Sequence, residues 1–271
     1  MAAPNAITVP QLLRLIGTPQ APVIVDICID PDFEADPHLI PGSFRHPHTD
    51  IGGLHRRVGD GACVIVCQKG LKLSQGVTAW LRSDRVRAEY LEGGMFAWRD
   101  HPGAPRVPFA ALPKPIEGHT LWVTRHRPKI DRIACPWLIR RFVDPGARFL
   151  FVSPSEVMDV ADRFDATPFD VEDTFWSHRG PLCTFDIMLD EFGLRTEALD
   201  RLSHVVRGAD TNRHDLAPEA AGLLAVSAGL SRQYRDDHQQ LEAGLHLYDA
   251  FYRWARDGFG EGHDWPADRR K

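Results

Sequence analysis

The stretch VIVCQKGLK, residues 64–72, places a cysteine directly after an apolar run and before an amphipathic segment. A thiol between a strand and the first turn of a helix meets backbone N–H groups that have no partner inside the helix. Those groups and the helix dipole favour an anion, so this position favours a thiolate at neutral pH. Cys67 is therefore the predicted catalytic nucleophile, and it needs no separate general base because its sulfur is already ionised.

The loop that follows Cys67 has the composition of an anion-binding loop. Lys69 and Lys72 supply positive charge, and Gly70 allows backbone angles that bulkier residues resist. Such a loop suits a persulfide, R–S–S⁻, or a small sulfur oxyanion that binds before the attack. The residues predicted to bind the substrate are those of the loop: Gln68, Lys69, Gly70, Leu71 and Lys72.

The other cysteines have less reactive settings. Cys63 lies inside an apolar run and is predicted to be a core residue, because a free cysteine packs as a small hydrophobe. Cys28 either resolves an oxidised Cys67 or packs at a strand end, and packing is the favoured interpretation. The five cysteines form no CxxC pair, which predicts reduced thiols and a cytoplasmic location.

Composition and charge exclude several classes of protein. The chain has 271 residues, 43% of them hydrophobic, and a net charge of −5. We expect a globular protein with a sizeable core and no broad binding to nucleic acids or membrane surfaces. No apolar run approaches the roughly 20 residues that span a bilayer, and the first residues lack the pattern of a secretory signal.

The first half alternates short apolar runs with helical patterns. Residues 23–27, 63–67 and 88–94 are predicted strands, whereas 9–17 and 74–82 have apolar residues at helical spacing. This alternation predicts an α/β domain with a mainly parallel sheet and flanking helices. The proline-rich segment 101–119 is predicted to be a linker. The sequence therefore predicts one domain over 1–115 and a second over 116–271.

The second half is predicted to be α-rich (α+β) with a small βαβ-like start. Residues 120–126 and 147–152 are predicted strands, with a helix entered through Pro136 between them. From residue 183 onward the pattern is mostly helical, and the stretch 236–258 carries a single apolar stripe.

Four motifs of the first half resemble, in order, those of a single rhodanese domain. They are VIVDICIDPDFE with Asp26 at the family's aspartate, HLIPGS, CQKGLK and LEGGMFAW. One Cys-x-x-Gly pattern alone is weak evidence, whereas four ordered matches over roughly 100 residues are specific. The resemblance implies a flavodoxin-like α/β fold and transfer of sulfane sulfur through a persulfide on Cys67.

The chain also departs from the rhodanese pattern. The family often has arginine directly after the nucleophile and after the Asp-Val of the first strand, where this chain has Gln68 and Cys28. Leu73 replaces the family's Ser/Thr, and Ser74 comes one position later. These departures weaken the case for thiosulfate as the preferred donor and leave the persulfide chemistry in place.

A basic cluster begins the second half. Guanidinium groups suit tetrahedral oxyanions such as chromate, sulfate or phosphate. Arg140 and Arg141 are predicted to form a solvated basic face. The predicted oxyanion-binding residues surround a turn that also contains Asp131: Arg125, Lys129 and Arg132.

Imidazole and carboxylate groups of the second half suggest a divalent metal such as zinc, iron or manganese. His238, Glu242 and His246 recur every four residues, a spacing that a solvated helix face also produces. Cys183 is a further candidate on a separate segment. The predicted ligands are His178, Asp210 and His238.

Residues from about 120 to 257 resemble the C-terminal domain of the chromate-resistance protein B family. The matching stretches, in order, are KIDRIACPWLIRRFVDPGARFLFV, HRGPLCTFDIMLDEFGL, VVRGAD and GLHLYDAFYRWA. The family is linked to chromate resistance as a regulator or accessory protein. DNA binding is not carried over to this chain, because its N-terminal half is rhodanese-like.

Two functions are compatible with these observations. The preferred one is a rhodanese-type sulfurtransferase that passes sulfane sulfur from a small donor to a thiol acceptor through Cys67, with no cofactor needed for the transfer, under oxidant or oxyanion stress. The alternative is a non-catalytic sensor or regulator of chromate resistance that responds to an oxyanion such as chromate, or to a metal. The sequence does not identify the physiological sulfur donor or acceptor. It also leaves open whether the chain forms a homo-oligomer.

Overall fold

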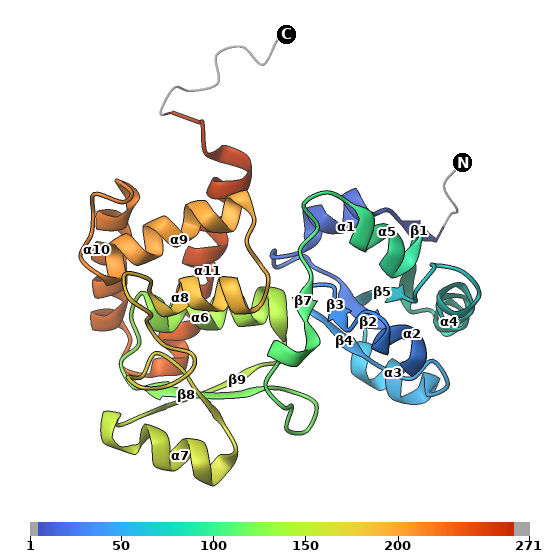
Figure 1. The fold of residues 1–271 in the computed structure, drawn as a ribbon, viewed down its shortest axis with the longest axis horizontal. Coiled ribbons are helices and arrows are strands. Elements are labelled where there is room, and N and C mark those ends of the chain that lie inside the picture. Colours follow the sequence, from blue (N-terminus) through green and yellow to red (C-terminus); the bar gives the residue numbers. More distant parts are fainter. Residues whose placement is uncertain (1–4, 263–271) are drawn as a thin grey trace.

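The computed structural model describes residues 5–262. Each half of the chain has its own parallel sheet, and the segment that contains β7 lies between the halves (Figure 1). The fold predicted from the sequence, an α/β domain with flanking helices followed by an α-rich domain, is confirmed. The boundary predicted near residue 115 stays a prediction.

The N-terminal sheet has five parallel strands in the order β1-β6-β5-β2-β4. Their bounds are Ala6–Ile7 (β1), Val23–Asp26 (β2), Ser43–Arg45 (β4), Ala62–Val66 (β5) and Arg87–Leu91 (β6). Alternate residues of β5 enter opposite cores: Val64 packs on one face, and Cys63 and Ile65 on the other. Because all strands are parallel, the residues that follow β2 and β5 meet at one edge of the sheet.

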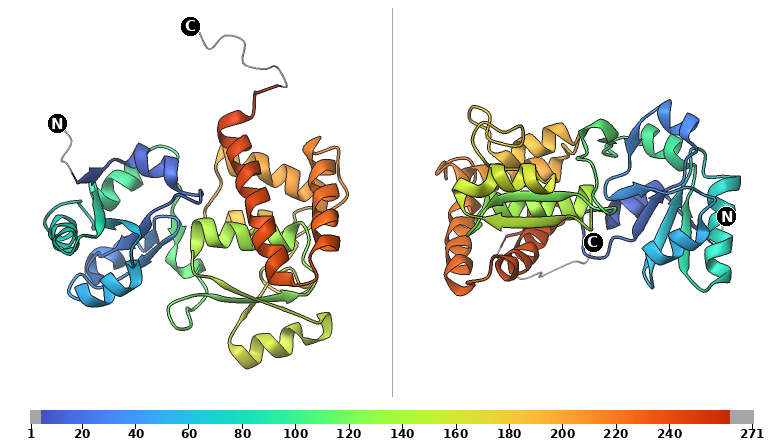
Figure 2. Two further views of the ribbon diagram at one scale, coloured as in Figure 1. Left: turned by 180° about the vertical axis from the view of Figure 1, so that it is seen from behind. Right: turned by 90° about the horizontal axis from the view of Figure 1, so that it is seen from below.

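Helices cover both faces of this sheet (Figure 2). The face with Val64 packs against residues of α1 and α5, whereas the face with Cys63 packs against α3 and α4. A short α2 follows β2. The helix bounds are Val9–Leu15 (α1), Asp30–Glu34 (α2), Ile51–Val58 (α3), Lys72–Ser83 (α4) and Gly94–Asp100 (α5).

The proline-rich segment is ordered against the N-terminal half. Its strand β7 (Val107–Pro108) pairs antiparallel with β3 (His38–Leu39), and a 3₁₀ turn follows at Phe109–Ala111. The indole of Trp98 donates to the carbonyl of Pro105 at 2.9 Å. This linker is therefore a packed strap rather than a free tether.

The C-terminal half begins with the predicted βαβ unit. Strands β8 (Leu121–Arg125) and β9 (Arg148–Val152) are parallel, and β10 (Thr167–Pro168) joins the other side of β8. Helix α7 (Val157–Phe164) covers one face, and a helical layer covers the other (Figure 1). That layer contains α6 (Asp131–Leu138), α8 (Thr184–Glu191), α9 (Glu197–Asp210), α10 (Glu219–Gln233) and α11 (Asp237–Arg253).

The prediction that the helix between β8 and β9 starts at Pro136 is wrong. Helix α6 starts at Asp131, and Pro136 lies inside it. The carbonyl of Ile130 accepts from the N–H groups of Ile133 and Ala134, which closes the first turn before the proline. The helix continues as a π-helix over Ile139–Val143. A proline inside a helix removes one backbone donor and crowds the carbonyl four residues earlier, so the burial of residues 133–138 has to offset that cost.

The two halves pack directly on each other. Gly17, which follows α1 with a φ of 77°, leaves no room for a side chain, because a Cβ there would lie 2.3 Å from Cζ of Phe142 and 2.8 Å from Cε1 of Tyr252. The N–H of Gly42 donates to the carbonyl of Phe142 at 2.6 Å. These contacts join both halves into one continuous apolar core. Among the described residues, no helix is long and apolar enough to cross a membrane.

Candidate functional site

Cys67 follows β5 at the carboxyl edge of the N-terminal sheet. The residue is 5% exposed and lies beside apolar residues of β5 and α4. Its Sγ donates to Oγ of Ser74 at 3.2 Å, and Oγ of Ser74 donates to the carbonyl of Leu71 at 3.2 Å. The sulfur is therefore buried, but a hydroxyl from the first turn of α4 faces it.

The loop after Cys67 is held by close backbone packing. A Cβ on Gly70, whose φ is 65°, would lie 2.5 Å from the carbonyl oxygen of Leu91 and 2.7 Å from the nitrogen of Gly93. A Cβ on Gly94 would lie 2.1 Å from the carbonyl oxygen of Cys67. Only glycines allow the loop and the start of α5 to approach this closely.

The backbone groups of this loop divide into two sets. The carbonyls of Cys67 and Gln68 accept from the N–H groups of Met95 and Phe96 in α5, at 3.0 and 3.1 Å. In the part of the chain that the structure describes, the N–H groups of residues 68–72 have no hydrogen-bond acceptor. Lys69 and Lys72 are exposed at the same loop. The loop next to the sulfur thus offers unpaired donors and positive charge, which is the chemistry of an anion cradle.

The other cysteines of the N-terminal half are in settings that keep them protonated. Cys63 is 1% exposed, and burial raises its pKa to about 11. Burial also raises the pKa of Cys28, and the charge of Asp26 adds to this effect. The backbone N–H of Cys28 donates to Oδ1 of Asp26 at 2.7 Å. These settings agree with the packing roles favoured from the sequence.

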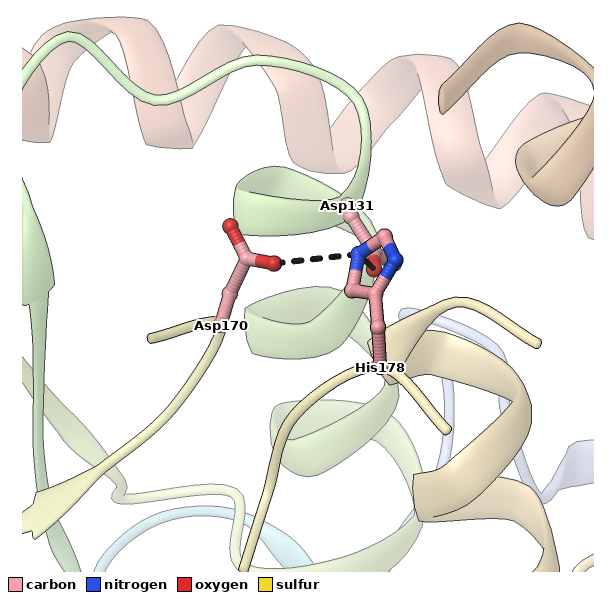
Figure 3. A group of neighbouring side chains, drawn as sticks. All are labelled: Asp131, Asp170 and His178. Atoms are coloured by element: carbon pink, nitrogen blue, oxygen red, sulfur yellow. Dashed lines mark ion pairs between the residues drawn. The ribbon is translucent and has the colours of Figure 1, made fainter. Parts of the chain in front are cut away.

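A second polar cluster lies in the C-terminal half. Asp131 is the first residue of α6, Asp170 follows β10, His178 precedes α8, and Asp210 is the last residue of α9. Nε2 of His178 lies 3.3 Å from Oδ1 of Asp170, 3.3 Å from Oδ2 of Asp210 and 3.6 Å from Oδ2 of Asp131. Figure 3 shows the imidazole ring beside the carboxylates of Asp131 and Asp170. We call these four residues the His178 cluster.

Asp131 is held by the start of α8. Its side chain is 1% exposed and accepts from the N–H groups of Thr184 and Phe185, at 2.7 and 3.0 Å. Because a helix N-terminus attracts negative charge, α8 supports a carboxylate at this depth. Burial nevertheless raises the pKa of Asp131 to about 7, against the lowering effect of His178.

Asp170 is held by arginines and a hydroxyl. Arg125 donates to it at 2.9 Å, Nε of Arg132 lies 3.3 Å away, and Oγ1 of Thr184 donates to Oδ1 at 3.1 Å. Burial alone would raise the pKa of Asp170, but His178 and the two arginines outweigh it and lower that pKa. The carboxylates of Asp131, Asp170 and Asp210 around its ring raise the pKa of His178 to about 12.

The structure brings together only part of the predicted metal set. His178 and Asp210 meet, whereas His238 packs its ring on Phe151 with 5.4 Å between the ring centres and makes no contact with the cluster within residues 5–262. Sequence reasoning noted Asp131 without naming it a ligand and missed Asp170. No pattern in the sequence marks Asp170, because the strand that precedes it, β10, has only two residues.

Two of the three predicted oxyanion residues converge, but on a carboxylate of the protein itself. Arg125 and Arg132 are both committed to Asp170, and Lys129 is exposed. The interpretation of Arg140 and Arg141 as a solvated face is wrong. Arg140 pairs with Glu242 at 2.6 Å. Nε and Nη2 of Arg141 donate to the two carboxylate oxygens of Asp249, each at 2.8 Å. These pairs fasten the end of α6 and its π-helical extension to α11.

Residues 122–255 match the family model described as "ChrB, C-terminal domain". This part of the chain is similar to the C-terminal domain of ChrB. Over 192 residues the chain is 31% identical to Protein ChrB of Cupriavidus metallidurans, an alignment that covers 66% of this chain and 57% of that protein. The chain thus spans less than two thirds of the length of this curated relative. The resemblance of the second half to the ChrB family is confirmed.

Solved structures similar to the N-terminal half of this chain cover about a third of the chain. A rhodanese-like domain protein from Staphylococcus aureus is 27% identical, with 36% of this chain and 94% of that chain covered and a TM-score of 0.32. A protein from Staphylococcus saprophyticus is 29% identical, with 34% and 89% covered and a TM-score of 0.30. We call the N-terminal half the rhodanese-like domain, after the motifs that it shares with that family.

Proposed function

We propose that the rhodanese-like domain is a sulfurtransferase that carries sulfane sulfur as a persulfide on Cys67. The observation that carries this proposal is the setting of Sγ. It lies between β5 and α4, next to a loop whose N–H groups at residues 68–72 have no acceptor in the described chain. A persulfide bears its negative charge on the outer sulfur, and unpaired N–H donors in the adjoining loop would stabilise that charge.

The chemistry is a pair of displacements at sulfur. The Cys67 thiolate attacks the sulfane sulfur of a donor, the donor's S–S bond breaks, and its electron pair leaves with the donor remnant. Cys67 then holds a persulfide. An acceptor thiolate attacks the outer sulfur, and the electron pair of the broken bond returns to Cys67 as a thiolate. Electrons and atoms balance over the two steps, so the transfer requires no cofactor or external oxidant.

Ser74 has a defined part in this cycle. Its hydroxyl lies 3.2 Å from Sγ, and when Cys67 is a thiolate the hydroxyl proton can rotate from the carbonyl of Leu71 toward the sulfur. Because α4 starts at Lys72, the same helix supplies its first-turn N–H groups. We expect small donors, since the sulfur is only slightly exposed. The acceptor we expect is a thiol, and the context is oxidant or chromate stress because of the ChrB-type domain.

The test compares Cys67→Ser with Cys63→Ala in the full chain. Sulfur release from a persulfide donor should fall to background in Cys67→Ser and stay near the wild-type rate in Cys63→Ala, because Cys63 is a core residue of β5. Both variants should keep the wild-type circular dichroism spectrum. Turnover that survives Cys67→Ser would remove Cys67 from the mechanism.

The alternative function is a non-catalytic sensor of a metal or oxyanion. Sensing of an oxyanion has little support, because Arg125 and Arg132 both bind Asp170. Sensing of a metal is supported by the His178 cluster. Chromate survival of cells that carry Cys67→Ser separates the two functions: a sulfurtransferase role predicts lost protection, and a sensor role predicts protection equal to the wild type.

A further inference from the structure

The His178 cluster has an arrangement that a single hydrogen bond does not explain. One nitrogen, Nε2, faces three carboxylate oxygens at 3.3, 3.3 and 3.6 Å. A ring nitrogen carries at most one proton, and a charge-assisted N–H···O bond is about 2.7–2.9 Å long. All three distances are longer than that, so the oxygens surround the nitrogen without any of them forming a close pair.

Such distances are those between neighbouring ligands of one ion. Around a tetrahedral metal with bonds of about 2.0–2.1 Å, two ligand atoms lie about 3.4 Å apart. The ligand atoms of Asp131, Asp170 and His178 all lie within 4.8 Å of one another, and Asp210 approaches the same nitrogen. The cluster is more than a group of acidic residues, because its central member is an imidazole that residues of three other segments surround.

The two most buried carboxylates of the cluster are also held by hydrogen-bond donors of the protein. Two N–H groups of α8 hold Asp131, and two guanidinium groups hold Asp170. Partners of this kind orient metal ligands before the ion arrives. The side chain of His178 is 39% exposed, whereas Asp131 and Asp170 are 1% and 9% exposed. Solvent thus reaches the cluster from the His178 side, which gives an ion a path of entry.

From this geometry we propose that Asp131, Asp170, His178 and Asp210 bind one divalent transition metal ion. A set of one imidazole and three carboxylates suits manganese, iron(II) or zinc better than the thiolate-preferring metals. The three carboxylates and the guanidinium groups of Arg125 and Arg132 together carry a net charge of −1 when the imidazole is neutral. A divalent cation therefore binds without a large excess of charge at the site. The site is independent of Cys67 and of the proposed sulfur transfer.

The test uses the full chain, stripped with a chelator, dialysed against buffer and titrated anaerobically with manganese(II), iron(II) or zinc(II). We expect one tightly bound ion per chain by elemental analysis for at least one of the three. His178→Gln should weaken that binding by about 100-fold or more, because loss of a ligand exceeds the 10–100-fold effect of losing a supporting partner. The matched control, His238→Gln, should bind as the wild type does.

Folding is monitored separately, because Asp131 is too deeply buried to be a safe target. His178 is partly exposed, so His178→Gln should retain the wild-type circular dichroism spectrum. With manganese(II), pulsed electron paramagnetic resonance should detect coupling to one imidazole nitrogen in the wild type and none in His178→Gln. Failure of all three metals to bind stoichiometrically, or equal binding by wild type and His178→Gln, would overturn the proposal.

Discussion

Replacing Gly94 by alanine tests whether the Cys67 loop must lie close against α5. A Cβ at this position would lie 2.1 Å from the carbonyl oxygen of Cys67 and 2.4 Å from the nitrogen of Gly70. Side-chain Cβ atoms essentially never approach other atoms closer than 3.0 Å, so the loop has to move by about 1 Å. Both obstructing atoms are backbone, and no side-chain rotation can relieve the overlap.

The size of the effect follows from this geometry. The φ of Gly94 is 61°, which costs an alanine about 1–2 kcal/mol, and the overlap adds about 1–3 kcal/mol. We expect Gly94→Ala to lower the free energy of unfolding by about 2–5 kcal/mol. A displacement of about 1 Å at a reacting group lowers the rate by roughly 100-fold, so sulfur transfer should fall by that factor.

The assay pairs Gly94→Ala with Gly76→Ala. Gly76 lies in α4, and a Cβ there meets nothing within 4 Å, so alanine should raise the free energy of unfolding by up to about 1 kcal/mol. Urea unfolding and turnover of a persulfide donor are measured for both variants. If Gly94→Ala kept wild-type stability and turnover, the close packing of the loop on α5 would not position Cys67.

Three further outcomes are expected. Ser74→Ala should lower turnover by about tenfold, because a hydroxyl bound to the sulfur contributes about 1.5 kcal/mol or more when the sulfur is charged. Unchanged turnover would mean that the hydroxyl does not act on Cys67. Gly17→Ala should lower the free energy of unfolding by about 2–4 kcal/mol in a urea titration, since its Cβ would overlap Phe142, and a wild-type midpoint would contradict the packing between the halves. Iodoacetamide at about pH 9 should modify Cys67 and spare Cys63. Burial raises the pKa of Cys63 to about 11, so its thiol stays protonated at that pH. Equal labelling of the two cysteines by peptide mapping would refute this difference.

The parts of the structure that the sequence predicts are those set by local pattern. The apolar runs VIVDI and CVIVC specify β2 and β5, and a cysteine at the end of the second run must lie at the carboxyl edge of a parallel sheet. Glycines at 70 and 94 are visible in the sequence as well. Their mutual approach is not, because it depends on how α5 packs on the loop.

The His178 cluster depends on long-range packing and for that reason was only partly predictable. Its four residues come from four segments, and each carries a common residue type at no characteristic spacing. Asp170 follows a strand of two residues, too short to show an alternating pattern. His238 has helical neighbours that suggest a ligand face, but tertiary packing places its ring on Phe151. The basic residues around Arg141 likewise predicted a solvated face. In the structure Arg141 pairs with Asp249, which is distant in the sequence.

Intact-protein and peptide mass spectrometry of the full chain, after incubation with a persulfide donor and removal of the excess, tests the central claim most directly. We predict a gain of one sulfur atom on the peptide that contains Cys67, its loss when a thiol acceptor is added, and no gain in Cys67→Ser. A chain that gains no sulfur at Cys67, or that gains it equally at Cys28 or Cys63, would contradict the account.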